Sequence, residues 1–549
     1  MNKKNQFVFK KHARIGAPAA EEDEEYLSSC FVDIGDLDIL RNCKDPRRII
    51  LGRTGSGKSA LLLKLKELEE RAIAVEPEEL ALERITNSQI FRFLLQTGVK
   101  LDIFFKLLWR HVFVIEILRD VYEIYDQQAK ESFIEYVLRL VKKDPERTER
   151  KAVLDYMERW GDQFWKETDK RTIDTTERLE GELSGAIGSA LPGVKMEALS
   201  SIKLSQEEKA KVVERTQDVV NRVQIKELSE MFDFLREDAL ADPQKKYFVL
   251  VDRLDEQWID DRLRFLLIRA LIETARDFQR VPNCKIVLAL RSDLIERVFR
   301  YTRDAGFQEE KYRGLYMKLY WTPDQLKQLV DKRVNALIEH KYTKKGVELE
   351  DVMVDSVHLE DQETQETIDY MLERTMQRPR DIIAFFNACI KQAVDRPRIT
   401  QQMVYAAEGE YSKTRFRALG DEWYADYPHL LDFAKILKGR QRQFCLKELD
   451  VDQFFLETLT GERVRPAPTE GPLYELGRGL IEEETDACTV RQQLAYVFYK
   501  VGLVGLKPEG HRPVCWSYTT VSAVSEGEIH DDARVHIHPG FYRVLGIRF

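Results

Sequence analysis

The stretch Gly52-Arg53-Thr54-Gly55-Ser56-Gly57-Lys58-Ser59 has residue types and spacing that can hold phosphate groups. It matches the pattern G-x-x-x-x-G-K-[ST], in which backbone N–H groups turn inward around an anion and the following helix adds the positive end of its dipole. Lys58 can reach the β- and γ-phosphates of a nucleotide, and the Ser59 hydroxyl can ligate Mg²⁺. The residues expected to line the phosphates are Gly52, Thr54, Gly55, Ser56, Gly57, Lys58, Ser59 and Ala60.

The residues on either side of this loop support the same interpretation. The apolar run 49–51 precedes it and is typical of a strand, and residues 60–65 follow with the pattern of a helix. The alternative is a glycine-rich turn between an ordinary strand and helix. The strand-before, helix-after setting favours the phosphate loop.

A second group of candidate residues follows the run Tyr247–Val251, whose five consecutive apolar residues predict a strand buried on both faces of a parallel sheet. Asp252 comes directly after this strand, where a carboxylate can hold Mg²⁺ together with Ser59. Asp255 and Glu256 lie one turn further, and either could orient or deprotonate an attacking water. Both remain candidates. The alternative is a strand end with a solvated acidic turn.

Two arginines are further candidates for contacts with a nucleotide. Arg291 follows the apolar strand 286–290 and could sense a γ-phosphate, although Arg291-Ser292-Asp293 is also a typical helix N-cap region. Arg380 lies at the start of a later helix, in QRPRDII, where a lid could bring a guanidinium onto a nucleotide. The alternative for Arg380 is an ordinary surface arginine.

The order of strand and helix patterns predicts an α/β fold with a parallel sheet. Thr322, Pro323 and Gln325 predict a capped helix that begins a helical lid. Helices over 430–437, 446–458 and 490–500, followed by a hairpin joining 501–506 to 514–518, predict a winged helix. We therefore expect four parts: an N-terminal segment 1–45, a core 46–320 with a helical insertion at about 90–241, a lid 321–410 and a winged-helix domain 411–549.

Composition narrows the class of protein. A net charge of −9 argues against a protein coated in nucleic acid, and seven scattered cysteines without a C-x-x-C pair indicate neither a disulfide framework nor a zinc site. We expect a cytoplasmic protein without a signal peptide or membrane span, with the apolar stretch 101–118 forming a buried or partner-facing helix pair. The acidic run 21–25 predicts a solvated helix face, and His536 and His538 predict a structural pair, not a metal site.

Taken together, GRTGSGKS, FVLVDRLDE, LALRSD, the capped helical unit with QRPRDII and the winged helix resemble the AAA+-related STAND and origin-recognition ATPase group. The N-terminal part, from Gly16-Ala17-Pro18 through GRTGSGKSALL, is similar to a bacterial P-loop ATPase family often found among anti-phage or genome-conflict systems. The resemblance covers the core, lid and wing, and the insertion only loosely. Many relatives have the catalytic acid directly after the magnesium acid, where this chain has Arg253.

The resemblance implies an ATPase that uses ATP and Mg²⁺ as a switch controlling self-assembly or a partner. Its expected catalytic residues are Lys58, Asp255, Glu256, Arg291 and Arg380. It further implies a homo-oligomer and a protein effector encoded separately, while no arginine finger can be named.

Two other functions fit parts of the sequence. In the first, nucleotide controls DNA binding by the winged helix, whose candidate phosphate contacts are Lys438, Arg440, Arg442, Arg491 and Lys500. The acidic residues 482–486 lie nearby and count against it, and the salt dependence of duplex binding distinguishes the two functions. A small-molecule kinase fits poorly because a lid and wing leave no evident acceptor pocket.

Overall fold

A computed structural model describes residues 7–77, 101–124, 156, 222–256, 259–303, 308–342, 346–359, 363–460, 471–519 and 523–548. Two compact units make up the chain, and we call them the sheet unit and the helical unit. The sheet unit consists of Gly35–Gly52 and Leu61–Lys318; the helical unit consists of Met1–Ile34, Arg53–Ala60 and Leu319–Phe549. Most of the predicted insertion at 90–241 lies outside the described residues. The four domain boundaries stay a prediction.

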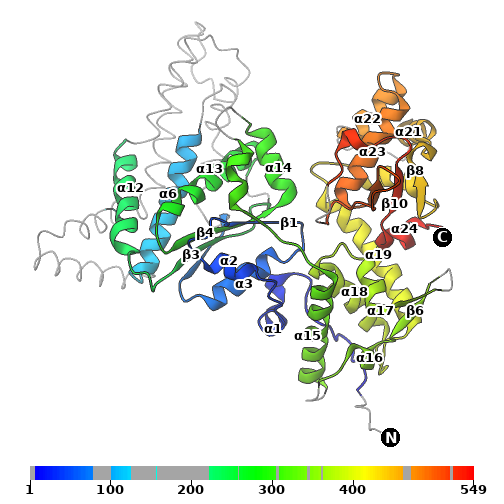
Figure 1. Cartoon of the computed structure of the whole chain (residues 1–549), viewed down its shortest axis with the longest axis horizontal. Coiled ribbons are helices and arrows are strands. Elements are labelled where there is room, and N and C mark those ends of the chain that lie inside the picture. Colours follow the sequence, from blue (N-terminus) through cyan, green and yellow to red (C-terminus); the bar gives the residue numbers. More distant parts are fainter. Residues whose placement is uncertain are drawn as a thin grey trace, which may run out of the picture. The chain divides into compact units, whose positions relative to one another are not determined.

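The sheet unit is built on five parallel strands in the order β2-β3-β4-β1-β5 (Figure 1). Their bounds are β1 Ile49–Gly52, β2 Ala72–Val75, β3 Tyr247–Val251, β4 Cys284–Arg291 and β5 Tyr316–Lys318. All five residues of β3 are buried, as the continuous apolar run predicts for a strand covered on both faces. The predicted α/β fold with a parallel sheet is confirmed.

Helices pack against this sheet and against one another. Those of the sheet unit are α2 Asp36–Arg41, α6 Asp102–Val121, α12 Arg222–Phe234, α13 Asp261–Asp277 and α14 Ser292–Tyr301; α3, Lys58–Leu68, leads in from the phosphate loop. The apolar stretch 101–118 forms the single helix α6, not a helix pair, and Trp109 Nε1 donates to the Leu267 carbonyl of α13 at 2.9 Å. None of the described helices is long and apolar enough to cross a membrane.

The helical unit contains a run of helices that lie side by side in Figure 1. They are α15 Pro323–Lys341, α16 Leu349–Val352, α17 Thr367–Glu373, α18 Pro379–Gln392 and α19 Gln401–Glu422, with the small hairpin β6 Ser356–His358 and β7 Thr364–Glu366. We call residues 323–422 the α15–α19 segment. The capping box of Thr322 and Gln325 is present with Pro323 at the first turn, so this predicted helix start is confirmed.

The N-terminal residues pack on the α15–α19 segment. Phe9 pairs with Val394, and Asp23 forms a buried ion pair with Arg333 of α15 at 2.5 Å. The predicted solvated face holds for Glu21, Glu22 and Glu25, which are exposed, but it is wrong for Asp23. The acidic run forms two short turns, η1 Ala20–Glu22 and α1 Glu24–Leu27, and Asp23 between them is 3% exposed because Arg333 supplies its counter-charge.

A C-terminal lobe, residues 430–548, follows in the same unit. Its helices are α20 Leu430–Phe433, α21 Val451–Thr460, α22 Pro472–Ile481, α23 Ala487–Val501 and α24 Tyr542–Leu545; its strands are β8 Gln443–Cys445, β9 Val504–Lys507 and β10 Arg534–Ile537. The strands form an antiparallel sheet in the order β8-β10-β9.

The hairpin in this lobe differs from the predicted one. Helix α23 continues to Val501 and ends at Gly502, whose φ of +85° suits a residue without a side chain. Strand β9 then pairs with β10, while the expected second strand, 514–518, contributes the isolated bridge between Cys515 and Leu506. Apolar runs mark both segments in the sequence, but strand partners depend on contacts distant in the chain.

Candidate phosphate-binding site

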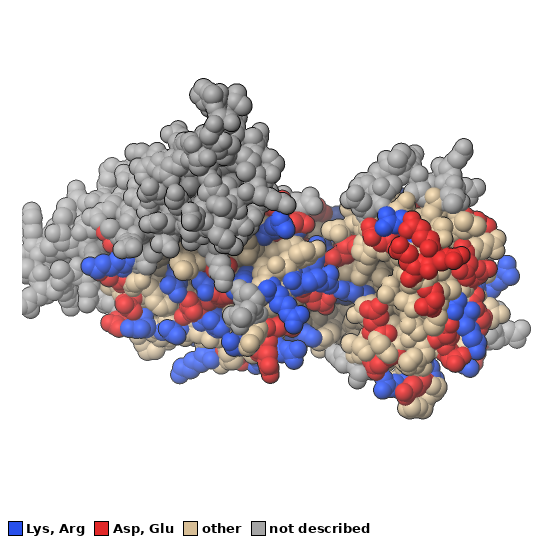
Figure 2. All heavy atoms as spheres, turned by 90° about the horizontal axis from the view of Figure 1, so that it is seen from above, with Lys and Arg blue, Asp and Glu red and all other residues tan. Residues whose placement is uncertain are grey.

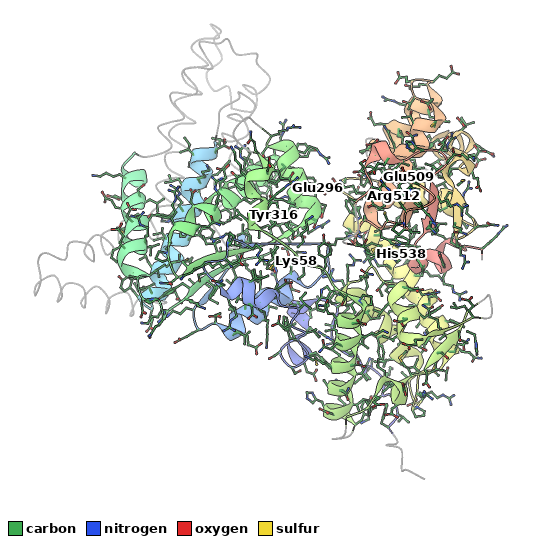
Figure 3. The ribbon with its side chains drawn as sticks, viewed as in Figure 1. Lys58, Glu296, Tyr316, Glu509, Arg512 and His538 are labelled. Carbon is green, nitrogen blue, oxygen red and sulfur yellow. The ribbon has the colours of Figure 1, made fainter. Side chains whose placement is uncertain are left out.

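Residues 53–60 of the phosphate loop belong to the helical unit, and the backbone form of the loop depends on its glycines. Gly55 has φ +77° and Gly57 has φ +97°, in the left-handed region that favours glycine. Helix α3 begins at Lys58, which Figure 3 labels, and the Lys58 Nζ donates to the carbonyl oxygen of Arg53 at 3.1 Å. Ser59 occupies the first turn of the same helix. Lys58 therefore lies across its own loop.

Side chains and backbone from the start of α15 and α18 hold the outer side of this loop. Three consecutive loop carbonyls each accept a hydrogen bond. Arg378 Nη1 donates to Thr54 at 2.7 Å, and the Arg380 N–H donates to Gly55 at 3.4 Å. Trp321 Nε1 donates to Ser56 at 2.8 Å. In a trans peptide the carbonyl and the N–H point in opposite directions. Fixing the carbonyls on one side therefore directs the following N–H groups to the other.

The chemistry of the loop fits an anion. Besides these N–H groups and Lys58, the Oγ1 of Thr54 and the Oγ of Ser56 are buried and have no hydrogen-bond partner among the described residues. Hydroxyls can donate to phosphate oxygens, and backbone N–H groups at a helix start commonly do so. The donor set therefore matches a phosphate group.

Arg378 is the arginine most firmly tied to the loop, and the sequence interpretation missed it in favour of Arg380. Its guanidinium is 2% exposed and pairs with Asp381 at 2.9 Å and Glu422 at 3.4 Å; Arg415 completes the network with Glu422 at 2.7 Å. Burial alone would lower the pKa of Arg378, but the attraction of Asp381 and Glu422 raises it above its usual value. A charged group held this way serves as a fixed donor to the loop.

Arg380 borders the loop differently. Its Nε donates to the carbonyl of Pro18 at 3.2 Å, which ties α18 to the N-terminal segment. A Cβ added to Gly55 would lie 2.7 Å from the Cβ of Arg380, so this approach requires glycine in the loop. Its role as a phosphate contact stays a prediction.

In the sheet unit, the carboxyl ends of three adjacent strands bring the candidate residues Asp252 and Arg291 to one edge of the sheet. Strand β4 lies between β1 and β3, Gly52 at the end of β1 pairs with Arg291, and Asp252 follows the last residue of β3. Parallel sheets bind ligands outside this edge. The Asp252 Oδ1 accepts from the N–H of Arg253 at 2.9 Å. Its carboxylate is of the hard oxygen type that Mg²⁺ prefers.

The acidic turn after β3 is held by arginines. Arg264 donates to the carbonyls of Asp255 at 3.4 Å and Glu256 at 2.9 Å, which fixes the turn while leaving both carboxylates exposed. Arg291 forms a two-pronged pair with Asp293, and its Nη1 lies 3.7 Å from the Asp255 Oδ2. Arg291 therefore reaches Asp255 and also stands at the start of α14. Its role as a γ-phosphate sensor stays a prediction.

Arg253 adopts a left-handed backbone conformation, with φ +56°, and directs its guanidinium to an acid on another segment. Its Nη1 lies 3.3 Å from Glu76 Oε2, and its Nε lies 3.9 Å from Glu256 Oε1. Both Asp255 and Glu256 stay candidates for activating water. Asp255 faces Arg291, and Glu256 faces Arg253.

The two C-terminal histidines have structural surroundings. His538, labelled in Figure 3, is 0% exposed and packs against the rings of Trp516 and Phe541, and its Nδ1 accepts from the Gly540 N–H at 3.0 Å. No cluster of three potential metal ligands occurs among the described residues.

We expect His538 to make the helical unit less stable in acid. Burial lowers its pKa to about 3, whereas an unfolded histidine titrates near 6.5. The unfolded chain therefore binds more protons between these values, so the stability from His538 is present above about pH 6.5 and is lost progressively as the pH falls toward 3. Between about pH 7 and about pH 5 the free energy of unfolding should fall by about 2 kcal/mol from this residue.

Denaturant unfolding at the two pH values measures this loss. His538→Asn keeps an acceptor for Gly540 and should reduce the pH dependence by that amount, while His511→Asn at an exposed position should leave it unchanged. Equal pH dependence in wild type and His538→Asn would contradict the assignment.

Comparisons with known proteins give one domain match and several distant similarities. Residues 324–420 match the FunZ-associated C-terminal helical domain, a range that lies within the α15–α19 segment and overlaps the predicted lid. The chain is 20% identical over 555 residues to the transposon gamma-delta 80.3 kDa protein of Escherichia coli (strain K12), covering 97% of this chain and 67% of that protein. It is 32% identical over 166 residues to Protein CASP of Arabidopsis thaliana, covering 28% of this chain and 22% of that one. Among solved structures, Cdc6p from Pyrobaculum aerophilum is similar with a TM-score of 0.28 and 12% identity, covering 94% of both chains.

Proposed function

We propose that this protein binds and hydrolyses ATP with Mg²⁺ and that the α15–α19 segment acts as a lid which responds to the nucleotide. The observation that carries the proposal is the set of three consecutive loop carbonyls, residues 54–56, each held by a donor from the start of α15 or α18. A change in the loop backbone on binding phosphate would alter all three contacts together. Phosphate binding and lid position are thereby linked.

Each candidate residue has a role in this reaction. The loop N–H groups and Lys58 bind and orient the phosphates, and Ser59 and Asp252 are the residues that would hold the metal. A metal ion held there would supply positive charge to offset the charge that develops on the phosphate oxygens. Asp255 or Glu256 orients the attacking water, while Arg291 and Arg380 stabilise charge on the γ-phosphate. Catalysis of this type depends on positioning and electrostatics.

The finer proposal is a switch of the STAND or AAA+ kind. In this proposal hydrolysis resets a conformation that governs self-assembly or a separately encoded effector, and the biological setting is anti-phage defence. Support comes from the order of parts along the chain: phosphate loop, acidic strand end, capped helical lid and C-terminal lobe. We further propose that this lobe is a winged helix; the succession of its helices and the β8-β10-β9 sheet support that proposal.

We expect ATP to change the size of the protein in solution. Light scattering after size exclusion should show a larger species with ATP and Mg²⁺ than without nucleotide, because lid closure would complete an assembly surface. Lys58→Ala should remain at the nucleotide-free size, since the loop loses its phosphate-binding cation. A wild-type protein that binds ATP and keeps one size would contradict the assembling switch.

DNA binding through the C-terminal lobe is the second candidate, favoured by the winged-helix order of its elements. The charges of the lobe give it less support. Arg491 pairs with Asp531 at 2.5 Å, and Arg440 donates to the carbonyls of Ile436 and Glu448, so these cations are engaged within the fold. Figure 2 shows acidic side chains gathered on the right of the view. Glu482–Glu484, which follow α22 in this lobe, are exposed. We therefore favour the switch.

A further inference from the structure

Arg53, the second residue of the phosphate loop, reaches into the C-terminal lobe. Its Nη2 donates to the carbonyl of Val501 at 2.7 Å, and its guanidinium carbon lies 6.0 Å from the ring centroid of Tyr518. Gly502 leaves room for this approach, because a Cβ there would lie 2.9 Å from Arg53 Nη1. All of these residues belong to the helical unit. The loop is thus joined to the end of α23.

The guanidinium of Arg53 is incompletely satisfied in this position. Its Nη1 is buried and has no hydrogen-bond partner among the described residues, and burial lowers the pKa of Arg53 to about 10. The buried Arg378 and Arg333, by contrast, each form a close ion pair with a carboxylate. A buried cation without a close carboxylate is costly, so Arg53 would gain from a fully charged partner.

Neighbouring loop residues are attached to different parts of the helical unit. The side chain of Arg53 bonds to the C-terminal lobe, while the carbonyl of Thr54 accepts from Arg378 of the α15–α19 segment. A backbone change at residues 53–54 would therefore affect both parts. This arrangement could not be predicted from the sequence, because Arg53 occupies a position of the motif that admits any residue.

We propose that Arg53 is a positioning residue that couples phosphate binding in the loop to the C-terminal lobe. Without nucleotide its side chain holds the end of α23, and binding of nucleotide breaks this contact, which we call the latch. The inference rests on the proposed nucleotide binding. Phosphate oxygens offer a guanidinium charged, two-pronged partners, whereas the lobe offers it the Val501 carbonyl and the Tyr518 ring. Binding of ATP draws the guanidinium toward the phosphates, and residues 499–518 lose the donor that held them.

Hydrogen exchange measures this coupling in the full chain. In wild type, saturating ATP with Mg²⁺ should speed amide exchange in peptides spanning 499–518 by about fivefold or more, the range of typical couplings between sites. In Arg53→Ala the same peptides should exchange quickly without nucleotide and should not respond to ATP. If Arg53 had a purely structural role, Arg53→Ala would speed exchange by the same factor with and without ATP. The response of these peptides to ATP would then remain.

Two controls separate this inference from the function on which it rests. Arg491→Ala removes another lobe arginine, one that pairs with Asp531 away from the loop, and should keep the ATP response. Binding of a fluorescent ATP analogue is measured in parallel. Wild type that binds no nucleotide would overturn both proposals. Wild type that binds nucleotide without faster exchange at 499–518, or an Arg53→Ala variant with the full response, would overturn the latch alone.

Discussion

Lys58→Ala should reduce steady-state ATP hydrolysis by at least about 100-fold, the loss typical of removing one preorganised charge-stabilising group. The Lys58 ammonium lies across the phosphate loop, bonded to the carbonyl of Arg53, and a methyl group cannot replace its charge. Asp252→Ala should cause a loss of similar size, since it removes a carboxylate expected to hold the metal. Release of free phosphate at saturating ATP and Mg²⁺ is the measurement.

A matched control lies on the same helix. Lys66 is exposed on α3, about two turns beyond the loop, and Lys66→Ala should hydrolyse ATP at the wild-type rate. Wild-type turnover in both Lys58→Ala and Asp252→Ala would refute the proposed ATPase. A phosphorylated acceptor in place of free phosphate would indicate a kinase instead.

Arg378→Ala should lower the free energy of unfolding of the helical unit by about 3–5 kcal/mol, as expected when one partner of a buried ion pair is removed. Asp381 and Glu422 would remain buried with Arg415 as their shared counter-charge, and the carbonyl of Thr54 would lose its donor. Denaturant unfolding followed by circular dichroism measures the change.

Arg380→Ala provides the comparison, two residues away on the same helix start. Arg380 is partly exposed, and its side chain makes one hydrogen bond among the described residues, to the carbonyl of Pro18, so we expect a loss of about 1 kcal/mol or less. The contrast between the two arginines is the critical result. Equal destabilisation by both substitutions would show that the ion-pair network of Arg378 does not support the loop.

The features predicted correctly from the sequence depend on local patterns. Five consecutive apolar residues identify β3 because a central parallel strand is covered on both faces. The capping box at Thr322 is set by residues within one helical turn. In the loop, the left-handed conformations fall at Gly55 and Gly57, and Gly57 is the second glycine of the motif. In each case the physical cause lies within a few residues of its effect.

The features that were missed depend on residues far apart in the chain. QRPRDII contains two arginines around Pro379, and only Glu422 and Arg415 on another helix distinguish the buried Arg378 from Arg380. In the sequence, Asp23 cannot be distinguished from the solvated acids beside it. Its buried partner, Arg333, lies 310 positions away in the chain. The partner of β9 likewise proved to be β10, beyond the adjacent apolar run. Local patterns carry no information about such partners.

The position of β4 between β1 and β3 also sets a length. Neighbouring strands lie about 4.8 Å apart, so the ends of β1 and β3 are separated by about 10 Å across the sheet. Gly52 and Asp252 therefore cannot hydrogen-bond to one another, and only a bridge several atoms long could join them. This spacing suits an extended polar ligand that crosses the ends of both strands. A longer acid in place of Asp252 would shorten that span by the length of one methylene group.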